Sequence, residues 1–141
     1  MNLLEKVDVI TKVCDVAGKE YSIESALDKL DSEWNNLALD IISYKDSGTH
    51  IMKVSEDIMR LLDDHIVMTQ SMSFSPFKKP FAERISVWEG KLRLVQEVLD
   101  SWMACQRAWL YLEPIFSSDD IMNQLPVESK RFTTMDKTWR R

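Results

Sequence analysis

The chain has 141 residues, of which 45% are apolar and 29% charged, and its formal net charge at pH 7 is −5. This length and apolar content fit one folded domain and exclude an intrinsically disordered tail. Only three glycines and four prolines are present, which excludes a turn-rich β-sandwich and a glycine-rich phosphate loop, and the negative net charge disfavours nucleic acid as a partner. The composition therefore predicts a helical, soluble chain without a nucleotide site.

Neither a membrane span nor a secretion signal is expected. The longest apolar run, Ala108–Leu112, has five residues, whereas a membrane-spanning helix needs about twenty. The first eight residues contain acids and lack a basic segment followed by an apolar one, so the expected compartment is intracellular. Cys14 and Cys105 stand alone within helical patterns, so both thiols are predicted to be reduced and mostly buried.

Two helices are predicted before the first strand. The first covers residues 3–17, where apolar residues recur at steps of three and four, and Gly18 loosens the pattern. The second covers residues 23–39, with Ser22 as its N-cap. Each helix has an apolar stripe that must pack against another element.

A hairpin, a third helix and a loop are expected next. Two β-friendly runs within 41–54 flank a short turn that closes on Gly48, and glycine tolerates the positive φ that such a turn requires. Ser55 and two acids then supply an N-cap and a favourable first turn for a helix that reaches about Met72. Serines and a proline interrupt the pattern over 71–79, the clearest internal boundary. The parts predicted on its two sides are residues 1–72 and 80–141.

One long helix is predicted over about 80–112. Pro80 suits its first turn, where the missing N–H is not needed, and the next proline is Pro114. Apolar residues alternate steps of four and three through four heptads, interrupted chemically only by Gln106. A second apolar stripe widens this face, so the helix is expected to contact more than one neighbour. The first stripe contains Phe81, Ile85, Trp88, Leu92, Val95, Leu99, Trp102 and Trp109, and the second contains Val87, Leu94, Val98, Cys105, Ala108 and Leu112.

Two shorter helices are predicted to follow. Pro114 is expected to end the long helix, and the serines and acids of 117–120 to begin a short helix that reaches Leu125. Pro126 begins the last helix, 127–141, which lacks a stop signal, so the chain is expected to be cut from something larger. Five of the last twelve residues are basic, which indicates either a contact surface for an anion or a solvated helix end.

No catalytic or metal-binding constellation is predicted. Asp63, Asp64 and His65 are adjacent, but neighbours on a helix point about 100° apart and cannot form a triad by themselves. His65 is therefore expected either on a solvated surface or as a hydrogen-bonded structural residue. The two histidines and two cysteines lack the spacing of a metal site. Four of the five tryptophans fall on apolar helix faces, which favours core packing over a base-stacking platform or an aromatic box.

A tryptophan-rich run, residues 102–116, carries a family resemblance. It is similar to the signature of the N-terminal part of the motor region of dynein heavy chains, and residues 113–118 resemble the axonemal form more than the cytoplasmic one. The resemblance covers about residues 17–141, and its last third is the specific part. The positions that carry it are Trp88, Trp102, Gln106, Trp109, Tyr111, Leu112, Glu113, Pro114, Phe116, Asp120, Leu125 and Pro126.

The resemblance implies a mechanical role. In dynein heavy chains such a region is similar to the first part of the linker, a helical arm that lies across the ring of ATPase modules and bends with the nucleotide cycle. Residues 1–141 are thus expected to form one all-α unit, an elongated bundle with a small hairpin, which transmits force in cilia or flagella and is not an enzyme by itself. The loop 71–79 and the break at 117–119 are the expected hinges, because backbone angles change most cheaply there.

The resemblance also implies partners and a location. The direct partner would be the rest of the heavy chain, meaning the ATPase ring, the remaining linker and the tail, while other dynein subunits and microtubules are reached through the parent motor. No cofactor, metal, nucleic acid or membrane is expected, and the location would be the axoneme, within the cytoskeleton. The alternative is a free-standing helical adaptor whose apolar stripe binds a partner helix.

Overall fold

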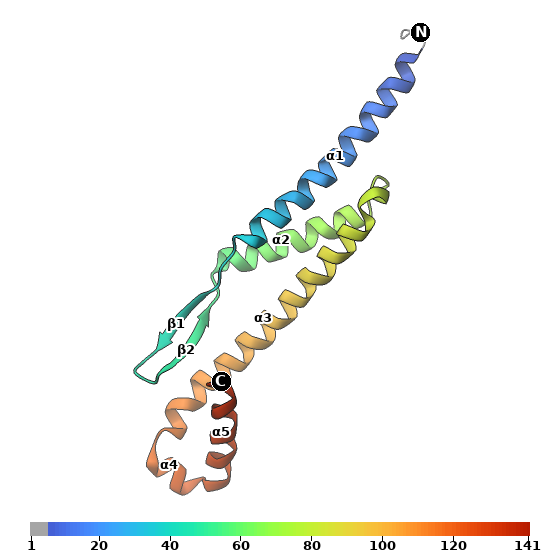
Figure 1. The fold of residues 1–141 in the computed structure, drawn as a ribbon. Helices are drawn as coiled ribbons and strands as arrows, with labels where there is room; N and C mark the ends of the chain where they lie inside the picture. Colours follow the sequence, from blue (N-terminus) through green and yellow to red (C-terminus); the bar gives the residue numbers. More distant parts are fainter. Residues whose placement is uncertain (1–5) are drawn as a thin grey trace. The chain divides into compact units, whose positions relative to one another are not determined.

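The computed structural model describes residues 6–141, a series of helices with one β-hairpin (Figure 1). The predicted all-α class with a small hairpin is confirmed. No helix within the described residues is long and apolar enough to cross a membrane. In chain order the elements are α1 (Val7–Asn35), β1 (Asp40–Tyr44), β2 (Thr49–Lys53), α2 (Glu56–Ser73), the 3-10 turn η2 (Lys79–Phe81), α3 (Ala82–Phe116), α4 (Asp119–Gln124) and α5 (Pro126–Trp139).

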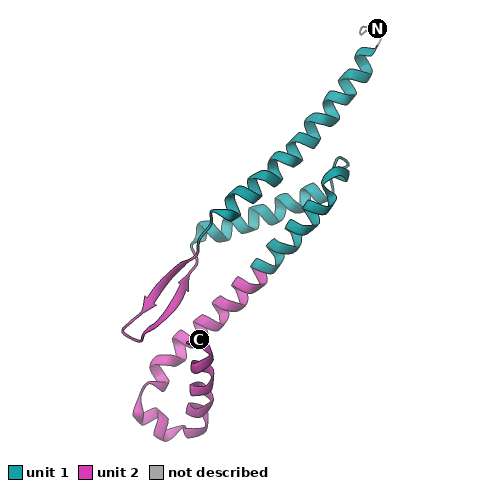
Figure 2. Cartoon of the chain, in the orientation of Figure 1, with its two compact units in different colours: residues 1–38, 55–95 teal, residues 39–54, 96–141 magenta. Residues whose placement is uncertain are grey.

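The chain divides into two compact units (Figure 2). Unit 1 comprises residues 1–38 and 55–95, and unit 2 comprises residues 39–54 and 96–141. Unit 1 therefore holds α1, α2 and the first part of α3, whereas unit 2 holds the hairpin, the rest of α3, α4 and α5. The turn 71–79 lies inside unit 1, and its role as an internal boundary stays a prediction.

Apolar side chains from all three helices of unit 1 form its core. Burial of each such side chain stabilises the fold by about 1.5–3 kcal/mol, so tertiary packing, more than helix propensity, holds these helices together. An ion pair supports the packing at the surface, because Nη2 of Arg84 lies 3.0 Å from Oδ1 of Asp28 and 2.9 Å from Oδ2 of Asp31. The buried apolar residues are Ile23, Leu27 and Leu30 of α1, Leu62 and Met72 of α2, and Ile85, Trp88 and Leu92 of α3.

The first two predicted helices are one helix, α1, of 29 residues, so the predicted break was wrong. Gly18 costs the helix only about 0.5–1 kcal/mol, and no proline blocks the backbone bonds. Ser22 is not an N-cap, because its hydroxyl donates to the carbonyl of Gly18 at 3.0 Å inside the helix. The helix ends at Asn35 rather than residue 39, where the Asn36 side-chain amide donates to the Ser32 carbonyl at 2.8 Å. The predicted start at residue 3 lies outside the described residues.

The predicted hairpin and third helix are confirmed. The strands are antiparallel, with Asp40 opposite Lys53 and Tyr44 opposite Thr49, and Gly48 has the expected positive φ of 72°. Ser55 caps α2, since its hydroxyl oxygen accepts from the backbone N–H of Ile58 at 3.3 Å. These local signals succeed because each depends on residues adjacent in the chain.

The long helix α3 begins after Pro80 as predicted, but it ends at Phe116, so the prediction that Pro114 terminates it was wrong. The fixed φ of proline is compatible with a helix, and the cost is the lost N–H bond to the carbonyl four residues earlier together with a clash between the ring and that carbonyl. The helix ends instead where the backbone N–H and the hydroxyl of Ser117 both donate to the carbonyl of Glu113, at 3.0 Å and 2.6 Å.

The remaining predictions for α3 and the C-terminal helices are partly confirmed. Helix α4 begins at Asp119, although Ser118 makes no side-chain cap bond, and Pro126 begins α5. The first apolar stripe of α3 is buried at most positions, whereas Val87, Leu94 and Val98 of the second stripe are about half exposed. The prediction of buried thiols was wrong, because both cysteines lie on exposed helix faces.

Candidate functional site

The residues of the tryptophan-rich run face the hairpin and α5 within unit 2. Gln106, Trp109 and Glu113 follow one another at steps of three and four, which places them on one face of α3. Asp136 and Arg140 face them from α5 and its C-cap. We call these five residues the hairpin clamp.

The side-chain amide of Gln106 bonds to the outer edge of β2, as the backbone of a third strand would. Its Nε2 donates to the carbonyl of Met52 at 2.8 Å, and its Oε1 accepts from the N–H of Met52 at 2.8 Å. Both backbone groups of Met52 are thus paired on the side of β2 away from β1. The side chain of Gln106 is buried, and a buried amide is stable only when its polar atoms are bonded in this way.

Trp109 is the centre of an aromatic cluster. It is 1% exposed, its ring meets the edge of Tyr44 with centroids 5.0 Å apart, and it stacks on Trp139 at 5.5 Å. Trp102 contacts Trp139 in turn, with centroids 5.3 Å apart. Such aromatic pairs add about 0.5–1.5 kcal/mol each beyond their buried area, so one cluster joins the hairpin, α3 and α5.

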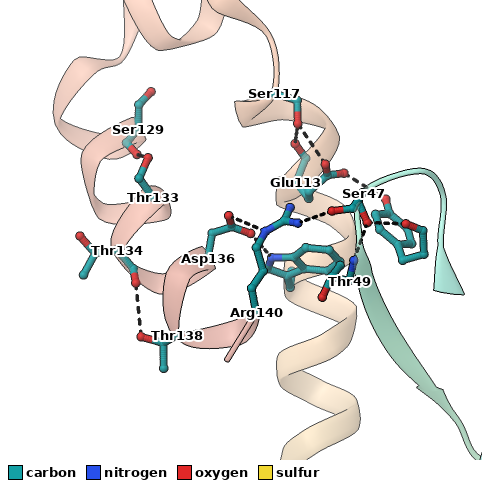
Figure 3. A network of polar contacts seen from close by, with 12 residues as sticks. Ser47, Thr49, Glu113, Ser117, Ser129, Thr133, Thr134, Asp136, Thr138 and Arg140 are labelled. Carbon is teal, nitrogen blue, oxygen red and sulfur yellow. Dashed lines mark hydrogen bonds and ion pairs between the residues drawn. The ribbon is translucent and has the colours of Figure 1, made fainter. Parts of the chain in front are cut away.

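Polar bonds close the cluster on the side of α5. The indole N–H of Trp109 donates to Oδ1 of Asp136 at 2.8 Å, and Nε of Arg140 donates to Oδ2 of the same carboxylate at 2.8 Å. A second guanidinium nitrogen of Arg140 donates to the carbonyl of Ser47 at 3.0 Å, as Figure 3 shows. Arg140 therefore joins the end of α5 to the turn of the hairpin. This contact within the chain is neither the anion contact surface nor the solvated helix end considered for the basic C-terminal residues.

Glu113 closes the cluster on the side of the hairpin turn. Its Oε2 accepts from the hydroxyl of Tyr44 at 3.1 Å, and its Oε1 accepts from the hydroxyl of Ser117 at 3.1 Å. Lys45 lies 3.9 Å from the same carboxylate. The Tyr44 side chain, and after it the charge of Glu113, raise the pKa of Lys45. Gln106, Glu113 and Asp136 thus use both polar side-chain atoms in contacts inside unit 2.

Comparison with known proteins identifies the family. The family model of the dynein heavy chain, N-terminal region 2, matches residues 1–141. The chain belongs to the dynein heavy chain family. Over 141 residues, all of this chain, it is 60% identical to dynein axonemal heavy chain 1 of Mus musculus and 58% identical to that of Homo sapiens. It is 46% identical to dynein axonemal heavy chain 3 of Mus musculus over 134 residues, 95% of this chain. The chain spans about 3% of the length of these relatives.

The remaining positions of the dynein resemblance lie apart from the clamp. Trp88 is buried in unit 1, where the ammonium of Lys91 lies 5.1 Å from the centroid of its ring. Phe116 stacks on Phe132 of α5 with centroids 5.1 Å apart. Leu112 is half-buried and Pro114 is exposed within α3, whereas Tyr111, Asp120, Leu125 and Pro126 are exposed in α3, α4, the α4–α5 junction and α5.

A buried polar cluster in unit 1 of this dynein segment was not predicted. The indole N–H of Trp34 donates to Nδ1 of His65 at 2.8 Å, and Nε2 of His65 lies 2.9 Å from Oε2 of Glu33. His65 is 4% exposed, so it is the structural residue of the two alternatives, while Asp63 and Asp64 are exposed. Its partners lie on α1, about thirty positions away in the sequence, and only the place of Trp34 on the apolar stripe pointed to α1 as a neighbour.

The polar groups of both clusters have a structural role. The indole N–H can bond Nδ1 only when that nitrogen is unprotonated, so Nε2 carries the proton, on the side of the ring that lies 2.9 Å from the Glu33 carboxylate. Burial lowers the pKa of His65, against the raising effect of the Glu33 charge. Within residues 6–141, no three His, Cys, Asp or Glu side chains gather closely enough to hold a metal ion. The polar atoms of both clusters hold helices and strands together.

Proposed function

We propose that residues 1–141 are a non-catalytic mechanical segment of the linker of an axonemal dynein motor. The segment couples rearrangement of the ATPase ring to displacement of the tail in ciliary or flagellar motility. The hairpin clamp is the observation that supports this proposal. At positions that resemble the dynein signature, the aromatic rings and polar side-chain atoms hold the hairpin and α5 against one continuous helix of 35 residues.

A force-bearing segment needs stiffness, and the clamp supplies it. The bonds of Gln106 and Trp109 lie at part-buried positions, where a hydrogen bond is stronger than in water, and those of Gln106 have to break before β2 moves on α3. A single unbroken helix transmits displacement along its axis because all of its backbone bonds run in that direction. Membership of the dynein heavy chain family favours this role over that of a free-standing adaptor.

The proposal places the other activities of the motor outside these residues. ATP is bound and hydrolysed in the ring, and microtubules and the other dynein subunits are contacted by other parts of the complex. The direct partner of the segment is the rest of the heavy chain, namely the ring, the remaining linker and the tail. The location is the axoneme of a cilium or flagellum.

A distance measurement in the intact heavy chain tests the proposal. A fluorophore at position 111, where Tyr111 is 72% exposed, is paired with a second fluorophore on the ring. We expect the energy transfer between them to change with the bound nucleotide, because a linker moves relative to the ring. Constant transfer in every nucleotide state, in a motor that still hydrolyses ATP, contradicts the proposal.

A clamp variant in the same motor separates coupling from catalysis. Gln106→Leu removes the bonds to Met52 and is expected to slow microtubule gliding several-fold while basal ATP hydrolysis is retained. Arg107→Ala, at an exposed position of the same helix, is the matched control and leaves gliding unchanged. Equal loss of hydrolysis and gliding in Gln106→Leu points to a catalytic or folding role instead. Hydrogen exchange at 71–79 and 117–119 across nucleotide states tests the two predicted hinges.

A further inference from the structure

The apolar stripe of α1 is longer than the core that it enters. In its C-terminal half the stripe is buried, with Ile23 6% exposed and Leu27 and Leu30 fully covered. In its N-terminal half the stripe continues in the same rhythm but is open to solvent, with Val9 60%, Val13 62% and Val16 40% exposed. The alternating steps of four and three along the whole stripe run through Val9, Val13, Val16, Glu20, Ile23, Leu27, Leu30 and Trp34.

The exposed half has the width of a packing surface. Val7 and Ile10 are 50% and 43% exposed, and together with the exposed Cys14 they extend the apolar face on one side of the stripe. The opposite side of the helix is polar, with Asp8, Thr11 and Asp15. Figure 1 shows the first turns of α1, in blue, extending past the turn between α2 and α3. A contiguous apolar face of this kind indicates a site of protein contact.

The covered and open halves meet at a cavity in unit 1. Lys19, Ser22 and Ile23 of α1 line it from one side, and Met72 and Phe77 are among the residues that line it from the other. Its volume is about 500 Å³, and the ammonium of Lys19 lies 4.8 Å from the centroid of the Phe77 ring. The open stripe is thus a direct continuation of the established packing of α1 on α2.

We propose that the N-terminal turns of α1 are covered by another helix of the same heavy chain, from outside residues 1–141. The strict heptad rhythm of the stripe selects a helix as the occupant, because knobs-into-holes packing needs a partner with the same period. Lys12 and Lys19 border the stripe on one side, and Glu20 interrupts it. The covering helix therefore carries acidic residues opposite the two lysines and a basic residue opposite Glu20. This inference rests on the proposed function only in that the chain is part of a longer heavy chain.

The charges favour such a helix over a second copy of this chain. A parallel, in-register pair of α1 helices would place Glu20 against Glu20 at a core position of the seam, and like charges there are destabilising. The same pair would place Lys12 opposite Ala17 of the other copy, without an acidic partner, whereas Lys19 would face Glu24. A helix of different sequence satisfies all three charges.

Photocrosslinking in the intact heavy chain tests the inference. Benzoylphenylalanine is placed at Val13, in the centre of the open stripe, or at Thr11, on the polar side, as the matched control. Heavy and light isotope-labelled chains are mixed before irradiation, so that crosslinks within one chain and between two chains are distinguished by mass. We expect position 13 to give one dominant crosslink, to a helix of the same chain outside residues 1–141, and position 11 to give at least about tenfold less.

Every other outcome overturns the inference. Crosslinks from position 13 to a second copy or to another subunit assign the stripe to a different partner, and a yield no higher than at position 11 shows that the stripe is open in the motor. If any of these outcomes is found while the energy transfer between ring and linker still changes with nucleotide, the linker proposal is retained and the proposed covering helix is rejected.

A charge reversal tests the chemistry of the covering helix. Glu20→Lys is expected to lower the crosslink yield at position 13 about fivefold, because the partner's basic residue then faces a like charge. Asp15→Lys makes the same change of charge on the polar side and is expected to leave the yield unchanged. An unchanged yield in Glu20→Lys rules out the proposed charge complement.

Discussion

At the scale of single residues, His65 shows how burial decides the state of a side chain. Its two ring nitrogens are occupied by a donor from Trp34 and by the carboxylate of Glu33. A second proton would remove the acceptor that the indole N–H uses, and it would place a charge in a poorly hydrated site. The folded state therefore favours the neutral imidazole, which fits the direction in which burial moves the pKa of His65, downward.

This direction predicts a loss of stability in acid. The unfolded chain binds a proton at His65 as the pH falls through about 6.5, while the folded chain binds it only at lower pH, so the free energy of unfolding decreases as the pH falls below about 6.5. Urea unfolding of the 141-residue chain at pH 7.5 and 5.5 measures the decrease. His65→Gln is expected to flatten it, and His50→Gln, at an exposed strand position, is expected to leave it as in the wild type. A decrease of the same size in the wild type and His65→Gln contradicts the assignment.

The second residue-scale prediction concerns Gln106. Gln106→Leu keeps the volume but leaves the N–H and carbonyl of Met52 without their partners, which costs about 1–3 kcal/mol for each buried group that stays unpaired. Urea unfolding is expected to show this loss, and hydrogen exchange at Met52 is expected to accelerate. Arg107→Ala serves as the surface control, with a change within about 0.5 kcal/mol. Unchanged exchange at Met52 in Gln106→Leu shows that the bonds do not hold β2.

At the scale of elements, the signals that begin an element were reliable, whereas the residues expected to interrupt a helix were not. The hairpin, the capped start of α2 and the starts of α3 and α5 follow from neighbouring residues and were predicted correctly. The break near Gly18 and the stop at Pro114 were wrong because a breaker residue adds a cost of limited size, and a helix continues where its backbone bonds and packing outweigh that cost. Predictions from single residues do not include the stabilisation that comes from this packing.

The three glycines give a matched prediction for the elements. A Cβ added at Gly18 or Gly90 meets no atom within 4 Å, and both residues lie inside helices, so Gly18→Ala and Gly90→Ala are each expected to stabilise the chain by about 0.5–1 kcal/mol. Gly48 has a φ of 72° in the hairpin turn, so Gly48→Ala is expected to destabilise it by about 1 kcal/mol. Thermal unfolding of the three variants checks both signs. Destabilisation by Gly18→Ala would mean that α1 is not a continuous helix in solution.

At the scale of the whole molecule, the partners in the clamp could not be found from the sequence. The positions on α3 followed from the heptad pattern and the family resemblance, but Gln106 bonds a residue 54 positions away and Trp109 one 27 positions away. Only the fold decides which strand and which helix lie opposite. Gln106 was the exception in its stripe, and a polar residue at an apolar position is the one sequence signal that pointed to a specific partner.

The proposed linker function gives the last prediction, which concerns α3. Three chain connections join the two units, at residues 38/39, 54/55 and 95/96, and the last of them lies inside α3. Pro114 is tolerated because α3 ends two residues later, whereas a proline at the exposed Glu97 removes a backbone bond in mid-helix and costs about 3 kcal/mol or more. In the intact heavy chain, Glu97→Pro is therefore expected to reduce microtubule gliding strongly while ATP hydrolysis continues, and Glu97→Ala to leave both unchanged. Normal gliding in Glu97→Pro, with the kink verified by hydrogen exchange around residue 97, would show that displacement does not pass along α3.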